Sequence, residues 1–310
     1  MTGKIQHCSE LLAEFKDTLS RGAASLRGVN TGFGCIDSNL RGFKPGALTV
    51  LAARPSMGKT FLALNIVTNI ALGRSAPDQP GCPVGVFCPE LTASDLVRRM
   101  VCCHAGVPQS HICDGFISSV NMARLNEAEE RLREMLILFD DSPGIDIHDL
   151  RDNARQMTGA HGVSLILIDS LQSVHARELV HLGRQAELAY IALSLKQMAR
   201  ELDVPVLVVS QLSRGAELRG GEECPLLSDL DKFGITRVAD VVMFLRRPSR
   251  ITGSSRYNEQ NLVIMDIAMN RNGPSMIELE LHFDGTTGRF CDPLDNNNLS
   301  KEHGNIFVKH

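Results

Sequence analysis

One segment of the sequence has the residue types and the spacing of a phosphate-binding loop. It reads Ala53-Arg54-Pro55-Ser56-Met57-Gly58-Lys59-Thr60, between an apolar run at residues 48–52 and a helix-forming stretch at 60–72. In that context, backbone N–H groups and a helix N-terminus can surround the phosphates of a nucleotide. Lys59 would add a positive charge, and Thr60 would offer a hydroxyl to Mg²⁺. The alternative is an ordinary strand–turn–helix corner that happens to contain Gly-Lys-Thr.

Three further polar side chains stand at or just past the ends of apolar runs. They are Glu90 after residues 84–88, Asp169 after 165–168 and Gln211 after 204–209. At the carboxyl edge of a parallel sheet, such side chains face a ligand crevice. Asp169 could hold a water of the Mg²⁺ shell, Glu90 could polarise the water that attacks the γ-phosphate, and Gln211 could contact that phosphate. From the residues alone, helix capping by the two carboxylates and a surface position for Gln211 stay open.

The elements around these residues indicate an α/β fold. Apolar runs that read as strands occupy residues 48–52, 84–88, 136–139, 165–168, 204–209, 241–245 and 262–267, with a hairpin at 275–290. Helical patterns occupy residues 60–72, 94–104, 119–135, 147–157 and 185–202. Continuous apolar strands that alternate with helices predict a mainly parallel sheet covered on both faces.

The N-terminal residues predict a helix outside this alternation. Residues 4–20 carry apolar side chains at helical spacing: Ile5, Cys8, Leu11, Leu12, Phe15 and Leu19. Residues 21–34 are rich in Gly, Ser and Asn and are interpreted as a linker. We therefore divide the chain into a linker helix and linker at 1–28, a globular domain at 29–291, and a mobile tail at 292–310.

Composition narrows the class of protein. The 310 residues are 43% hydrophobic, enough for a sizeable core, and the net charge of -4 places any nucleic-acid site in a local patch. Nine cysteines without ligand-type spacing favour reduced thiols over a zinc site. We expect no membrane span, because no sufficiently long apolar stretch occurs. With no Trp and two Tyr, contacts to phosphates are a more plausible grip on a nucleic-acid strand than base stacking.

Taken together, the strings resemble the C-terminal motor domain of the DnaB-type bacterial and phage replicative helicases. The resemblance covers about residues 29–290. Besides the phosphate loop, it is carried by Val29-Asn30-Thr31-Gly32-Phe33, Pro89-Glu90-Leu91, Ile168-Asp169-Ser170-Leu171-Gln172, Ser210-Gln211-Leu212-Ser213-Arg214, Ser228-Asp229-Leu230, Ala239-Asp240 and Asn270-Arg271-Asn272-Gly273-Pro274. Ala53 at the first loop position is familiar in that family.

The resemblance implies a RecA-like P-loop NTPase that binds ATP and Mg²⁺ between subunits of a ring. Lys59, Thr60, Glu90, Asp169 and Gln211 would come from one subunit, and Arg271 would be the arginine finger of the next. The N-terminal helix would pack on the adjacent subunit, giving a homo-oligomer that is expected to be a hexamer. Single-stranded DNA is the implied substrate, and a helicase loader or a primase is a possible partner.

The sequence departs from the family pattern at several points. Met269 stands where the family usually carries a Lys, and Asp231-Lys232-Phe233-Gly234 replaces a channel loop that usually reads Arg-Glu-Ser-Gly. Lys232, Gly234, Arg177 and Arg184 are the remaining candidates for DNA contacts. The basic cluster of Arg246, Arg247, Arg250 and Arg256 is interpreted as a solvated loop. Because the chain starts at the linker helix, we expect a collarless helicase of a phage or mobile element, or a fragment.

The favoured function is therefore ATP-dependent translocation on single-stranded DNA with duplex unwinding, in the cytoplasm of a bacterial or phage-infected cell. Two alternatives stay open. One is a DNA-dependent ATPase or loading factor of the same fold that does not unwind, because the channel loop has lost a cation. The other is a nucleotide-gated assembly protein for which DNA is not a substrate, because the net charge is negative.

Overall fold

A computed structural model describes residues 7–20, 28–74, 80–115, 117–212, 225–231, 234–250 and 259–293. The strands are β1 (Leu48–Ala53), β2 (Val84–Phe87), β3 (Ile137–Asp140), β4 (Leu165–Asp169), β5 (Val206–Gln211), β6 (Val241–Arg246), β7 (Leu262–Asn270), β8 (Ile277–Asp284) and β9 (Arg289–Cys291). The helices are α1 (Cys8–Ser20), α2 (Gly34–Leu40), α3 (Lys59–Ala71), α4 (Ala93–Ala105), α5 (Gln109–Cys113), α6 (Ser119–Arg133), α7 (Ile147–His161), α8 (Arg184–Leu202) and α10 (Ser228–Asp231). Short 3₁₀ turns are η2 (Leu171–Ser173), η3 (Arg177–Leu182), η4 (Ile235–Arg237) and η5 (Pro248–Arg250).

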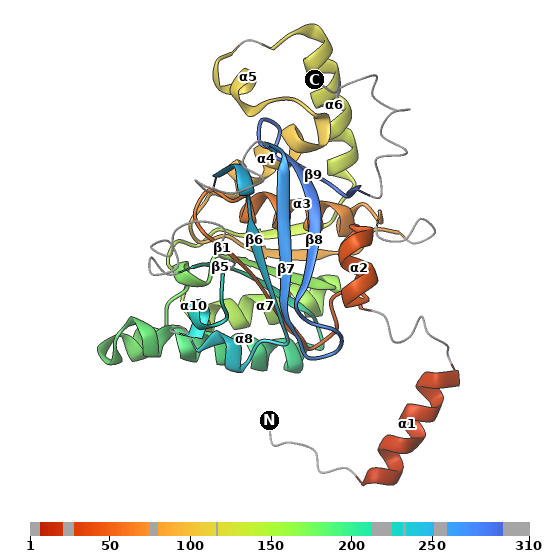
Figure 1. The fold of residues 1–310 in the computed structure, drawn as a ribbon, viewed down its shortest axis with the longest axis vertical. Helices are drawn as coiled ribbons and strands as arrows, with labels where there is room; N and C mark the ends of the chain where they lie inside the picture. The colour runs from red at the N-terminus through yellow and green to blue at the C-terminus, as the bar shows by residue number, and fades with distance from the viewer. Residues whose placement is uncertain are drawn as a thin grey trace.

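The strands form one sheet in the order β3-β2-β4-β5-β1-β6-β7-β8-β9 within the described residues. Figure 1 labels β1 and the strands from β5 to β9. The first six strands in this order, β3-β2-β4-β5-β1-β6, run parallel to one another. Strands β7, β8 and β9 extend the sheet with antiparallel pairing. This arrangement confirms the predicted α/β class with a mainly parallel sheet.

Two apolar cores lie on the two faces of the sheet, because neighbouring residues of a strand point to opposite faces. In β1, Leu51 packs in the same core as Leu62 and Ile66 of α3. Its neighbour Val50 packs in the other core with Leu195 of α8. All residues of β1 are buried, as its continuous apolar run requires. Burying each such side chain stabilises the fold by about 1.5–3 kcal/mol.

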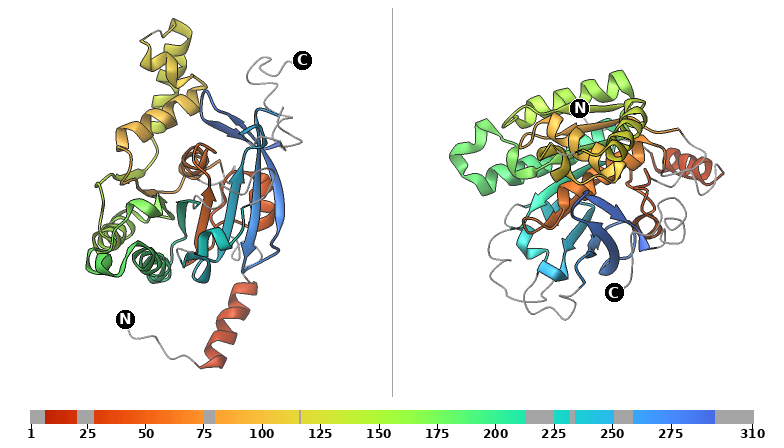
Figure 2. Two further views of the ribbon diagram at one scale, coloured as in Figure 1. Left: turned by 60° about the vertical axis from the view of Figure 1, so that its left-hand side comes forward. Right: turned by 90° about the horizontal axis from the view of Figure 1, so that it is seen from above.

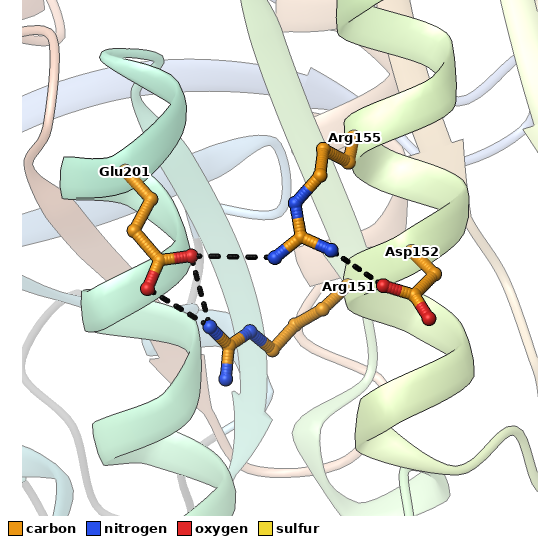
Figure 3. Close-up of polar contacts among 4 residues, drawn as sticks. All are labelled: Arg151, Asp152, Arg155 and Glu201. Atoms are coloured by element: carbon orange, nitrogen blue, oxygen red, sulfur yellow. Dashed lines mark hydrogen bonds and ion pairs between the residues drawn. The ribbon is translucent and has the colours of Figure 1, made fainter. Parts of the chain in front are cut away.

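Helices α7 and α8 lie together on one face and are also joined by polar contacts. Arg151 donates to both carboxylate oxygens of Glu201, at 2.9 and 3.0 Å, and Arg155 reaches the same carboxylate while it pairs with Asp152 (Figure 3). The two arginines hold the pKa of Glu201 below its usual range, with Arg151 the larger cause. The network therefore fixes the C-terminal part of α8 against α7.

Segment 21–34 is the clearest disagreement with the sequence-based interpretation. Residues 28–34 are not a linker. Val29 pairs with Phe43 in a β-bridge, and α2 begins at Gly34. The polar residues that suggested a linker are used locally, because the N–H and the hydroxyl of Thr31 both donate to the Asp37 carboxylate, at 2.8 and 3.0 Å. Residues 21–27 lie outside the described residues.

Helix α1 stands away from the body of the domain (Figures 1 and 2). Its apolar side chains Leu11, Leu12 and Phe15 are 46%, 55% and 55% exposed. No helix in the described part of the chain is long and apolar enough to cross a membrane. The N-terminal helix expected at 4–20 is thus present over Cys8–Ser20, and the described members of its apolar stripe are uncovered in the single chain.

Candidate functional site

The predicted phosphate loop connects β1 to α3 and turns sharply between them. Ser56 and Gly58 adopt left-handed backbone conformations, with φ of 61° and 101°. A side chain at Gly58 would be strained by that φ, and its Cβ would lie 3.2 Å from the ring of Phe290. Glycine is therefore required directly before α3, where the first backbone N–H groups of the helix are exposed to a ligand.

Lys59 starts α3 with its ammonium inside the loop. Its side chain is buried, and Nζ donates to the carbonyls of Ala53 and Arg54 at 3.0 and 2.9 Å. Burial lowers the pKa of this ammonium, while the nearby carboxylates of Asp169 and Glu90 favour its charged form. The structure thus holds one positive charge at the centre of the loop, where phosphates would replace the two carbonyls.

Asp169 and Thr60 form the donor pair expected for a divalent cation. Asp169 ends β4, and its buried carboxylate accepts a hydrogen bond from the Thr60 hydroxyl. Burial raises the pKa of Asp169, and the Thr60 hydrogen bond opposes that rise. Hydroxyl and carboxylate oxygens beside a phosphate loop fit Mg²⁺, which prefers few protein oxygens together with waters and substrate phosphates.

Glu90 reaches the same cleft from the segment after β2. Its Oε2 accepts hydrogen bonds from the hydroxyls of Ser170 and Ser173, both at 3.3 Å. Ser170 directly precedes η2, the turn that follows β4, and Ser173 is its last residue. Glu90 is therefore a base candidate that is oriented by its neighbours while its side chain stays exposed to the cleft.

These residues line one cleft of about 770 Å³ at the carboxyl edge of the sheet. Gln211 joins them from the end of β5, which lies between β4 and β1. From the phosphate loop, Pro55, Ser56, Gly58, Lys59 and Thr60 are among the lining residues. The structure therefore brings Lys59, Thr60, Glu90, Asp169 and Gln211 together, and the order β2-β4-β5-β1 is what places them side by side.

The cleft also has a wall that sequence reasoning missed. Arg247 and Phe283 lie there, with the guanidinium 4.9 Å from the ring centroid, and Asn261 and residues 284–286 continue the wall. Arg99 of α4 also lines the cleft, with its guanidinium 5.4 Å from the ring centroid of Phe61. A flat cation over an aromatic ring is a surface on which a planar base can stack. The only signal in the sequence was the arginine cluster at 246–256.

The interpretation of that cluster as a solvated loop was wrong for two of its members. Arg247 is buried and donates to the carbonyl of Gln260 at 3.2 Å. Arg246 forms ion pairs with Asp266 and Glu278 of the neighbouring strands. Arg250 is exposed and lines the cleft, and Arg256 lies outside the described residues. Sequence proximity hid this difference, because consecutive strand residues point to opposite faces.

Comparison with known proteins identifies this arrangement. The family model of the DnaB-like helicase C-terminal domain matches residues 28–292. The chain belongs to that family. The replicative DNA helicase DnaC of Bacillus subtilis is 34% identical over 277 residues, which are 88% of this chain and 59% of the relative. The chain thus spans about three-fifths of the length of this curated relative.

Two solved structures have the same fold. One is an ATPase domain that matches with a TM-score of 0.83 and 27% identity, over 93% of this chain and 99% of that one. The other is a DnaB-like replicative helicase, described together with its interactions with primase. It matches with a TM-score of 0.78 and 27% identity, over 94% of this chain and 67% of that one. The RecA-like fold expected from the sequence is therefore confirmed.

In this DnaB-like domain, Arg271 lies at the opposite edge of the sheet from the phosphate loop. Its backbone N–H donates to the carbonyl of Asp240 at 2.9 Å, at the start of β6. β6 runs parallel to β1, and Leu245, near the end of β6, pairs with Ala53. The four residue steps from Val241 to Leu245 span roughly 13 Å. Arg271 is thus separated from the nucleotide cleft of its own chain, and its guanidinium donates to the Arg237 carbonyl at 2.7 Å.

The residues predicted to contact DNA have different surroundings. Arg177 is exposed in η3, and Gly234 precedes η4 with a φ of 62°; both turns pack against α8. Lys232 lies outside the described residues. The Arg184 guanidinium donates to the carbonyls of Gln172 and Val174 at 2.6 and 3.1 Å and pairs with Glu187. DNA contacts at these residues stay predictions, and Arg184 has intramolecular partners that the sequence did not suggest.

Proposed function

We propose that this chain is an ATP-hydrolysing motor that moves along single-stranded DNA and separates duplex DNA as a ring of six subunits. The observation that carries the proposal is the single cleft that holds Lys59, Thr60, Asp169 and Glu90, with Arg271 at the far edge of the same sheet. Arg271 is too far from the cleft of its own chain to contact a nucleotide there. It could contact the nucleotide of an adjacent subunit, so that each subunit completes its neighbour's active site. The relatives named as replicative DNA helicases support unwinding as the output.

In the proposed reaction, the phosphates of ATP occupy the loop and the Lys59 ammonium moves from the Ala53 and Arg54 carbonyls to them. Mg²⁺, held by Thr60 and through water by Asp169, would neutralise charge on the phosphates. Glu90 accepts a proton from the attacking water while the water oxygen forms a bond to the γ-phosphorus. The bond between the γ-phosphorus and the bridging oxygen breaks, and ADP and phosphate leave. Gln211 senses the γ-phosphate, and Arg271 of the neighbouring subunit stabilises the developing charge.

Glu90→Gln should slow ATP hydrolysis by about two to four orders of magnitude while ATP still binds, because the amide keeps the shape and loses the base. Ser170 and Ser173 can still donate to the amide oxygen, so the side chain keeps its position. Single-turnover hydrolysis and equilibrium binding of a fluorescent ATP analogue check this. Glu134→Gln, which changes an exposed glutamate at the end of α6, is the matched control. Loss of binding in Glu90→Gln would make Glu90 a structural residue instead.

Duplex unwinding is tested with forked substrates that carry a 5′ or a 3′ single-stranded tail. ATP-dependent strand separation on one of the two forks is expected, and Lys59→Ala should abolish it. ATP hydrolysis that single-stranded DNA stimulates without strand separation would instead identify a non-unwinding ATPase. Hydrolysis that DNA leaves unchanged would identify an assembly protein.

Helix α1 is proposed to pack on the adjacent subunit of the ring, because its apolar stripe needs a surface. An isolated helix of this length is marginal in water, and Leu12 and Phe15 are more than half exposed. Leu12→Asp with Phe15→Asp is expected to convert the oligomer to monomers and to reduce ATP hydrolysis, since Arg271 no longer reaches a neighbour. Light scattering and ATP turnover measure both effects.

The matched control for that variant is Lys16→Asp on the same helix. It changes the net charge by two units, as the double variant does, but leaves the apolar stripe intact. If the double variant forms monomers with full activity, both the packing of α1 on the adjacent subunit and the shared active site are contradicted. An intact oligomer would contradict only the role of the helix.

The partners and compartment are proposed on the same basis. A primase or a loader is a candidate partner, since one solved DnaB-like helicase is described together with its interactions with primase. The proposed compartment is the cytoplasm of a bacterial or phage-infected cell, where replicating DNA and ATP are both present.

A further inference from the structure

The side-chain amide of Gln172 makes three hydrogen bonds to the end of β5. Its Nε2 donates to the Ser210 hydroxyl at 3.0 Å and to the Gln211 carbonyl at 3.2 Å. Its Oε1 accepts from the Gln211 backbone N–H at 3.2 Å. One side chain thus satisfies both backbone groups of Gln211.

At Gln211, β5 extends beyond the end of its neighbour β4. The pairing of β4 with β5 ends at Asp169 and Val209, because the chain leaves β4 and enters η2. On its other side β5 remains paired with β1 as far as Ala53, whose carbonyl accepts from Leu212. Since successive residues of a strand bond to alternate sides, the N–H and C=O of Gln211 face the missing strand. Gln172 takes the place of that strand for one residue.

The turn that carries Gln172 also contacts Glu90, the proposed base. Ser170 and Ser173, on either side of Gln172, both donate to Glu90. The turn therefore contacts the proposed base through two hydroxyls and the backbone of the proposed phosphate sensor through one amide. A shift of the turn would change the distance between Glu90 and Gln211.

The turn is fixed from behind by the first residue of α8. Arg184 donates to the carbonyls of Gln172 and Val174, and its guanidinium pairs with Glu187, which is 3% exposed. Helix α8 is in turn held to α7 at Glu201 (Figure 3). The position of η2 is thus set by a helix on which the candidate DNA-facing turns η3 and η4 also pack.

We propose that Gln172 is a positioning residue that fixes Gln211 relative to Glu90, so that the γ-phosphate is sensed and the attacking water is activated in one geometry. The inference rests on the proposed ATPase function and adds a residue to it. Gln172 acts through the Gln211 backbone and does not itself touch the nucleotide. Ground-state binding of ATP, which depends on the loop and Lys59, does not require it.

The test compares Gln172→Met, Gln211→Ala and the double variant with the wild-type chain. Methionine keeps the length of the side chain and removes the donor and the acceptor. Gln172→Met is expected to lower kcat by about ten- to a hundredfold, because small misplacements of reacting groups have effects of that size. KM for ATP and the Kd of a non-hydrolysable ATP analogue should stay within about twofold. Gln156→Met, an exposed glutamine on α7, is the matched control.

The decisive measurement is whether the two losses combine. If Gln172 acts through Gln211, the double variant should turn over no more slowly than Gln211→Ala alone, and Tm should be unchanged. Multiplied losses, a kcat of Gln172→Met equal to wild type, or a fall in Tm that accounts for the lost activity would overturn the inference while ATP hydrolysis by the wild-type chain stands. A wild-type chain that hydrolyses no ATP would overturn the proposed function and this inference together.

Discussion

Lys59→Ala is expected to reduce ATP hydrolysis by about two to three orders of magnitude, the effect of removing a preorganised charge from a transition state. The Lys59 ammonium is the cation at the centre of the phosphate loop, and it donates to two loop carbonyls that phosphates would replace. Steady-state turnover and binding of a fluorescent ATP analogue measure the loss. Strand separation should disappear with it.

The variant should remain folded. The ammonium is buried at a cost, as its lowered pKa indicates, and alanine removes that cost while leaving the carbonyls beside an open cleft. Thermal unfolding of Lys59→Ala should therefore stay close to wild type. Lys44→Ala, a partly buried lysine that does not line the cleft, is the control for removal of a lysine charge. Normal turnover by Lys59→Ala would remove the loop from the mechanism.

Arg271→Ala is expected to lower ATP hydrolysis by about three orders of magnitude or more, the range for an arginine finger. The structure gives the reason for testing it between subunits, because Arg271 and Lys59 lie at opposite edges of one sheet. Arg271→Ala subunits keep an intact cleft, and Lys59→Ala subunits keep an intact finger. Each should be inactive alone.

Mixing the two inactive variants should restore part of the activity. In a ring assembled at random from equal amounts, about a quarter of the junctions join an intact Lys59 to an intact Arg271. ATP turnover should therefore rise toward about a quarter of the wild-type value, and less if the junctions fire in sequence. Native mass spectrometry establishes that mixed rings form. No recovery in confirmed mixed rings would exclude action of Arg271 on its neighbour.

Met269 makes the same experiment informative about a second cation. The residue pairs with Val242 in the antiparallel part of the sheet, two positions before Arg271. The resemblance to the family implies a lysine at this position, so under the proposed mechanism this chain would offer one of two expected cations to the neighbouring cleft. The size of the Arg271→Ala effect measures how much one arginine supplies when that lysine is absent.

Local sequence was sufficient to predict the centre of the site. The phosphate loop needs consecutive residues of fixed types, and a strand that ends in Asp169 or leads to Glu90 is visible in a short window. The strand runs also predicted their own environment, since a strand buried on both faces is mostly apolar, and every residue of β1 and β4 is buried. For the same reason the α/β class and the parallel sheet could be expected from the order of the residues alone.

Predictions from a few consecutive residues failed where polar side chains contact partners far along the chain or across a nearby bend. Residues 28–34 looked like a linker because Gly, Asn and Thr are common in linkers, yet Thr31 is buried and bonded to Asp37. Arg247 looked solvated beside three other arginines, yet the hairpin of β8 and β9 brings Phe283 beneath it. Arg184 donates to two backbone carbonyls and pairs with Glu187, partners that the sequence did not suggest, while its contact with DNA stays a prediction.

The sequence by itself therefore predicted which residues would bind phosphate and determined which kind of sheet carries them, because both depend on residue types at fixed local spacing. Only the tertiary structure decided how far those residues stand from one another. Strand order placed Asp169, Gln211 and Lys59 side by side although long segments separate them, and strand direction put Arg271 at the opposite edge. The end of β4, one residue before Ser170, left a gap in the sheet that Gln172 fills. Such relations arise when separate segments pack together, and no local pattern of residues encodes them.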